Sequence, residues 1–151
     1  MTEFPPSLTS PNQRCVGCQQ SEPLGFDFAF AYQPIVDLRD HSIFAHEALV
    51  RGPHGEGALS VLGQVNESNR YRFDQRCRTQ AIAGASALGM QTHLSINFMP
   101  NAVYRPELCI RSTLEAARAH NFPLDQLIFE TLESEHVDNN RHLTNILREY
   151  R

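Results

Sequence analysis

The sequence predicts an α/β fold in which an antiparallel β-hairpin leads into a parallel sheet covered by helices. Two apolar runs, at residues 28–36 and 42–50, lie close together in the chain and indicate two paired antiparallel strands. Further along, strand-like and helix-like segments alternate, which is typical of parallel sheets built from βα units. The length of 151 residues is that of one ordinary domain.

The folded part is expected to begin near Phe26. Residues 1–25 are rich in Pro, Ser, Gln and Asn and show neither helical nor strand periodicity. We therefore expect residues 1–25 to form a flexible leader and residues 26–151 to form the domain.

The elements after the hairpin follow from periodicity and from breaking residues. Phe73, Cys77 and Ala81 recur at helical spacing, and Gly89 ends that helix. Pro100 prevents the extension of the next strand, because proline lacks the N–H that a sheet needs. The expected elements are helices near 58–65, 70–88, 106–120 and 138–150 and strands at 93–98 and 127–130.

The composition excludes several classes of protein. The net charge of −4 argues against a nucleic-acid-binding protein, because such a surface needs clustered basic side chains. All 13 basic side chains are arginine, whose planar fork suits single phosphate contacts on a small anionic ligand. No apolar run approaches the roughly 20 residues of a membrane span, and residues 1–10 lack the pattern of a signal peptide. We expect a cytoplasmic protein without a membrane or nucleic-acid partner.

Cys15 and Cys18 form a CxxC pair within the expected leader. As a zinc site the pair is half complete, because a structural zinc ion takes four ligands. As a redox pair it lacks the strand and helix that surround such motifs. We favour an ordinary leader segment, and zinc binding or redox chemistry stays an alternative.

Four short segments share their order and spacing with one known family. They are Tyr32-Gln33-Pro34-Ile35-Val36, Glu47-Ala48-Leu49-Val50-Arg51-Gly52, Ser95-Ile96-Asn97 and Phe129-Glu130-Thr131-Leu132-Glu133. From residue 26 to residue 151 the chain resembles the N-terminal half of an EAL domain, a family of phosphodiesterases specific for cyclic di-GMP. The order of Thr131 and Leu132 is reversed relative to the usual family pattern, which puts the packing around Glu133, a further candidate site residue, in doubt.

The resemblance implies a (β/α)8 TIM-like barrel whose first strands depart from the parallel order and whose active site lies at the carboxyl ends of the strands. It also implies that Glu47, Asn97 and Glu130 hold a divalent metal. Such oxygen ligands suit Mg²⁺ or Mn²⁺. By the same resemblance Arg51 contacts a phosphate of cyclic di-GMP, and Gln33 lies near a guanine or its sugar.

Each of these metal candidates also has an ordinary structural interpretation. A glutamate at the end of a strand is often only solvated, Asn97 could form a turn ahead of Pro100, and Glu130 could pair with an arginine. Their occurrence at the ends of three successive predicted strands favours ligand positions instead.

The resemblance further implies that additional aspartates, a catalytic lysine and later glutamates lie beyond Arg151, and the chain itself contains no lysine. We therefore expect an EAL-type domain for metal-dependent hydrolysis of cyclic di-GMP to the linear dinucleotide, truncated and inactive as this chain alone. The alternative is a non-catalytic module that binds cyclic di-GMP or another protein. Four strands cannot close a barrel and leave one edge open, which predicts a homo-oligomer or a complementing C-terminal half.

Overall fold

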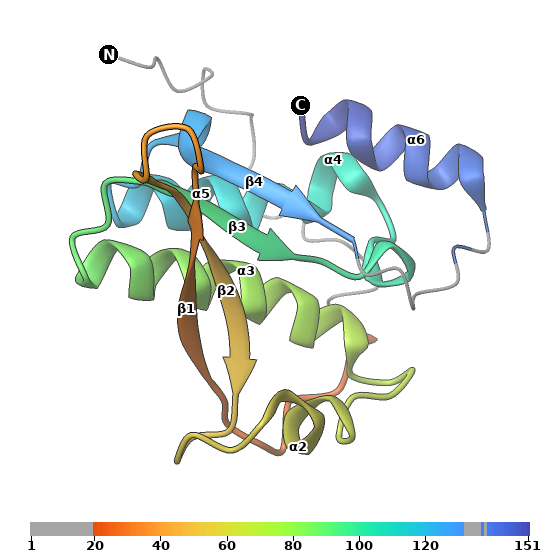
Figure 1. Ribbon diagram of the computed structural model, residues 1–151. Helices are drawn as coiled ribbons and strands as arrows, with labels where there is room; N and C mark the ends of the chain where they lie inside the picture. The colour runs from red at the N-terminus through yellow and green to blue at the C-terminus, as the bar shows by residue number, and fades with distance from the viewer. Residues whose placement is uncertain (1–19, 132–136, 138) are drawn as a thin grey trace.

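A computed structural model of the chain describes residues 20–131, 137 and 139–151. Its centre is a four-stranded sheet in the order β1-β2-β3-β4 (Figure 1). The β1–β2 pair is antiparallel, whereas β3 runs parallel to both of its neighbours. The predicted α/β fold with an antiparallel first hairpin is therefore confirmed. The strands are β1 (Ala29–Val36), β2 (Ile43–Arg51), β3 (His93–Asn97) and β4 (Leu127–Glu130).

The helices follow the predicted order with one difference. They are α2 (Ala58–Leu62), α3 (Arg70–Ala87), α4 (Pro106–Cys109), α5 (Arg111–Ala119) and α6 (Asn140–Glu149), with short 3-10 turns at Pro100–Ala102 and Leu124–Gln126. The single helix expected over residues 106–120 is interrupted between α4 and α5. There the Cys109 carbonyl accepts the Ser112 hydroxyl at 3.3 Å, and the Thr113 N–H donates to Ile110, three residues back, at 3.0 Å. A serine that competes for a backbone carbonyl in this way disturbs the regular helix.

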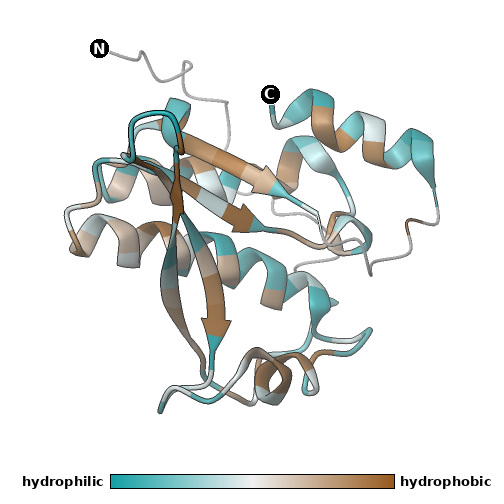
Figure 2. Cartoon of the chain, viewed as in Figure 1, coloured by the Kyte–Doolittle hydropathy of each residue, from teal (hydrophilic) through white to brown (hydrophobic). Residues whose placement is uncertain are grey.

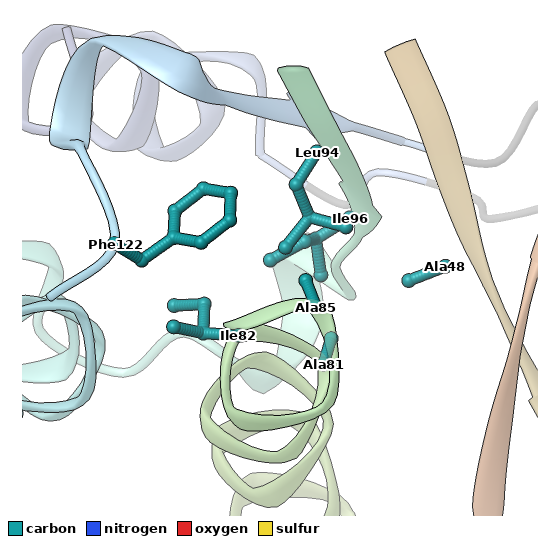
Figure 3. Packing of buried hydrophobic residues seen from close by; sticks show 7 residues of the cluster. All are labelled: Ala48, Ala81, Ile82, Ala85, Leu94, Ile96 and Phe122. Atoms are coloured by element: carbon teal, nitrogen blue, oxygen red, sulfur yellow. The ribbon is translucent and has the colours of Figure 1, made fainter. Parts of the chain in front are cut away.

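One face of the sheet is covered by α3 and by the end of α5 (Figure 1). Side chains alternate between the two faces of a strand, so Leu94 and Ile96 of β3 point toward α3 together. Figure 2 shows apolar colour along β2, β3 and β4, and hydrophilic colour over the turn between β1 and β2. The main core, drawn in Figure 3, consists of Ala48, Ala81, Ile82, Ala85, Leu94, Ile96 and Phe122.

The described part of the chain begins before the predicted start at Phe26. Ser21 is buried, and its hydroxyl donates to the Ser68 carbonyl at 2.9 Å. Arg72 of α3 donates to the Ser21 carbonyl, also at 2.9 Å, and Leu24 packs against the cluster around Phe73. Residues 20–25 thus contact the domain, while Cys15 and Cys18 lie outside the described residues.

Within the described ranges, no helix has both the length and the apolar character that a membrane crossing requires. The cytoplasmic location stays a prediction.

Tyr32 joins the hairpin to α3. Its hydroxyl donates to the Ala81 carbonyl at 2.7 Å, and burial raises the pKa of Tyr32 to about 12. A Cβ atom at Gly84 would overlap this hydroxyl. The glycine inside α3 is therefore what allows β1 to approach the helix so closely.

We expect Gly84→Ala to destabilise the domain, although the same change at an open helical position would stabilise it by about 1 kcal/mol. The added methyl group must displace Tyr32, and overpacking of this kind costs about 1–3 kcal/mol. Urea unfolding followed by circular dichroism measures the change. The cost should shrink in the Tyr32→Phe background, where the hydroxyl is gone. A Gly84→Ala chain as stable as the parent would contradict this account of the contact.

Candidate metal site

The parallel register brings polar side chains of three strands onto one face of the sheet. Glu47 of β2 lies beside Ser95 of β3, and Asn97 of β3 lies beside Glu130 of β4. Ser95 and Asn97 alternate with Leu94 and Ile96, so they face away from α3. The candidate ligands therefore share the face opposite the helical core.

Two hydrogen bonds connect these side chains. Asn97 Nδ2 donates to Glu47 Oε1 at 2.7 Å, and Ser95 Oγ donates to Glu130 Oε1 at 2.5 Å. Glu47, Asn97 and Glu130 are half-buried, whereas Ser95 is fully buried. The predicted convergence of Glu47 and Asn97 is present as a direct contact, and Glu130 is the next residue in register.

Glu47 is not the last residue of its strand, in agreement with the strand predicted over residues 42–50, in which it lies near the end. It is the fifth residue of β2, which continues to Arg51. Strand β2 pairs with β3 only as far as Ala48 and then continues as a partner of β1 alone. Glu47 therefore lies near the end of the parallel part of the sheet, as Asn97 and Glu130 do.

The two carboxylates of this group are suited to a cation. Two half-buried carboxylates lie on the same face of β2 and β4, the two strands on either side of β3, and neither forms an ion pair with any other described residue. Like charges in such a setting repel unless a positive group joins them. No cluster of three His, Cys, Asp or Glu side chains occurs in the described ranges, so the donor set consists of two carboxylates and the Asn97 amide. Rotating that amide by half a turn presents its oxygen in place of its nitrogen.

The two predicted substrate-contacting residues flank this group. Gln33 of β1 is the direct partner of Glu47 in the antiparallel register and is exposed. Arg51 lies on the same face of β2, roughly 13 Å further along the strand at 3.3 Å per residue. Its guanidinium donates to the Val50 carbonyl at 2.8 Å. Glu133 lies outside the described residues.

Comparison with known proteins identifies the family of the chain. Residues 21–151 match the EAL domain family. The chain belongs to the EAL domain family. A curated relative, the blue light- and temperature-regulated antirepressor BluF of Escherichia coli K12, is 29% identical over 107 residues, which are 70% of this chain and 27% of BluF.

Solved structures of EAL proteins share the fold. A standalone versatile EAL protein from Vibrio cholerae O395, in its cyclic-di-GMP-bound form, is 53% identical with a TM-score of 0.80, and the match covers 85% of this chain and 54% of that one. BlrP1 of Klebsiella pneumoniae, in a complex with manganese and cyclic di-GMP, is 26% identical with a TM-score of 0.75, over 84% of this chain and 33% of that one. The four-stranded sheet thus corresponds to part of the TIM-barrel-like EAL fold. The chain spans about half the length of the Vibrio cholerae structure.

A buried ion pair fixes the end of β3 in this EAL domain. Asp74 and Arg78 of α3 lie 3.1 Å apart with side chains that are each 1% exposed. Asp74 Oδ1 accepts the Met99 N–H at 2.9 Å, two residues after Asn97, and Arg78 donates to the Tyr150 hydroxyl at 2.7 Å. Burial raises the pKa of Asp74, an effect that Arg78 and the Met99 amide oppose. The pair therefore connects α3, the end of β3 and the residue after α6.

Sequence reasoning missed Ser95, Asp74 and Arg78. The alternation Leu94-Ser95-Ile96-Asn97 places Ser95 on the same face as Asn97, and that signal could have added it to the candidate group. Asp74 and Arg78 follow the apolar Phe73 and Cys77 directly in sequence. A carboxylate and a guanidinium four residues apart on a largely buried helix indicate an internal pair.

We expect Asp74→Asn to lower the free energy of unfolding by about 3–5 kcal/mol, because it leaves the Arg78 charge buried without its counter-charge. The amide oxygen can still accept the Met99 N–H, so the change isolates the loss of charge. Asp27→Asn is the matched control: the Asp27 side chain is 75% exposed and pairs with Arg76 at 2.8 Å. An exposed pair contributes less than about 1 kcal/mol. Equal effects of the two changes in chemical denaturation would contradict the importance of the buried pair.

Proposed function

We propose that this chain forms part of a cyclic-di-GMP phosphodiesterase domain in a cytoplasmic signalling protein, with Glu47, Asn97 and Glu130 as ligands of Mg²⁺ or Mn²⁺. The observation that carries the proposal is the convergence of these side chains on one sheet face, with the 2.7 Å contact between Asn97 and Glu47. Membership of the EAL family supports it, as does the manganese and cyclic-di-GMP complex of the related BlrP1.

The donor set fits a small divalent cation. Carboxylate and amide oxygens are the ligands that Mg²⁺ and Mn²⁺ prefer. Glu47, Asn97 and Glu130 would hold such a cation, and its charge would offset that of the two half-buried carboxylates. When bound, it supplies the charge stabilisation and the acidification of water that phosphodiester hydrolysis requires.

Arg51 and Gln33 have separate proposed roles. The guanidinium of Arg51 carries five N–H donors and uses one nitrogen on the Val50 carbonyl, which leaves others for a phosphate oxygen. Gln33, exposed beside Glu47, is placed to contact the base or the sugar of the nucleotide attached to that phosphate. Both side chains bind and orient the substrate.

Removing one ligand tests the metal site. We expect Glu130→Gln to weaken Mn²⁺ binding by the 151-residue chain by more than about tenfold, because a carboxylate ligand is replaced by a neutral amide. Electron paramagnetic resonance of free Mn²⁺ measures the affinity. Glu107→Gln is the control, since Glu107 is exposed and pairs with Arg105 at 2.5 Å. Equal Mn²⁺ affinity of the Glu130→Gln chain and the parent would remove Glu130 from the site.

The 151-residue polypeptide should not hydrolyse cyclic di-GMP at an enzymatic rate, even with excess Mg²⁺ or Mn²⁺. Three protein ligands fall short of what two-metal phosphoryl chemistry needs, and the loss of a single electrostatic stabiliser typically costs about 10²–10³ in rate. The assay follows conversion to the linear dinucleotide by chromatography. Adding the remaining part of an EAL domain, covalently or as a complementing chain, should produce activity.

A control separates contamination from real turnover in that assay. Glu47→Ala should abolish any activity that belongs to this site. Turnover by the polypeptide alone that disappears in Glu47→Ala would overturn the expectation of an incomplete site. Tight binding of cyclic di-GMP without turnover, even after complementation, would favour the binding module.

A further inference from the structure

Ser95 occupies the centre of the candidate site. It lies in register beside Glu47, and its hydroxyl donates to Glu130 Oε1 at 2.5 Å. It is 0% exposed, unlike the half-buried ligands around it. A polar group buried to this extent requires a hydrogen-bond partner, and Ser95 has a carboxylate.

The short contact fixes the Glu130 side chain. A serine hydroxyl has a single O–H to donate, and a bond to an ionised carboxylate is roughly twice as strong as a bond between neutral groups. The Phe98 N–H also donates to the Glu130 main-chain carbonyl at 2.9 Å. Donors from Ser95 and from Phe98, the residue after β3, therefore hold both the side chain and the backbone of Glu130, and the Ser95 hydroxyl occupies Oε1 only.

We infer that Ser95 is a positioning residue for the metal site, acting through Glu130. The inference rests on the proposed function. Without the hydroxyl, the Glu130 carboxylate can rotate away from Glu47 and Asn97. Part of the free energy of cation binding is then used to order the Glu130 side chain, which weakens the affinity. Hydrogen bonds to metal-binding carboxylates typically contribute 10–100-fold to metal affinity.

The test measures Mn²⁺ binding by the full 151-residue chain, using electron paramagnetic resonance of free Mn²⁺. Ser95→Ala should weaken the affinity by about 10–100-fold. Ser95→Thr keeps the hydroxyl and should restore most of the affinity, an outcome that loss of packing alone would not produce. Ser86→Ala is the matched control: it also removes a serine hydroxyl bound to an oxygen, here the His120 carbonyl at 2.7 Å, and it should leave Mn²⁺ affinity unchanged.

The outcomes separate this inference from the proposed function. If the parent chain binds Mn²⁺ and Ser95→Ala binds it equally well, Ser95 has no positioning role and the metal site stands. If the parent chain binds no Mn²⁺, the metal site and the role of Ser95 are both overturned. Should Ser95→Ala fail to fold by circular dichroism, Ser95→Cys is similar in size and a weak donor, and it should show the same loss of affinity.

Discussion

The register of β3 between β2 and β4 is the constraint on which the candidate site depends. Leu94 and Ile96 are buried against α3, and each such side chain contributes about 1.5–3 kcal/mol when it is fully buried. The hydrogen bonds that Ser95 and Asn97 donate to glutamate carboxylates contribute a comparable amount, about 1.5–3 kcal/mol each. A slip of one residue would turn Ser95 and Asn97 into the helical core. The apolar face and the polar face of β3 therefore favour the same register together.

The Asp74–Arg78 pair acts on the same strand from the other side of the sheet. A buried ion pair is a weak source of net stability, because removing two charges from water offsets most of their attraction. The pair instead fixes the position of the Met99 amide. It thereby also fixes the segment that follows Asn97 at the end of β3. Tyr150 extends the network past α6 and also packs between Phe98 and Phe129. Packing and charge thus restrain the ends of β3 and β4 together.

The sequence predicts the strands and their order well because each strand is short, apolar and bounded by a turn or by proline. It does not reveal the break between α4 and α5, which depends on whether the Ser112 hydroxyl turns inward to the Cys109 carbonyl. It places Glu47 near the end of the second strand but does not give the point where β2 and β3 part, because the length of their pairing is a tertiary property that periodicity does not contain. Ser95 is not predicted as a site residue for a related reason. A serine in a strand indicates a site only when a carboxylate from a neighbouring strand lies beside it, and the sequence does not show that contact.

The pairing of β2 with β3 ends before β2 does, so β2 consists of two parts with different strand partners. From Ala45 to Ala48 it pairs on both sides, with β1 and with β3, whereas from Leu49 to Arg51 its strand partner is β1 and Val50 packs against the cluster around Phe28 and Phe73. Glu47 therefore belongs to the part of β2 that has two strand partners, and Arg51 to the part that pairs with β1 alone. The positions of the two side chains thus depend on different strand pairs: that of Glu47 on both β1 and β3, and that of Arg51 on β1 alone.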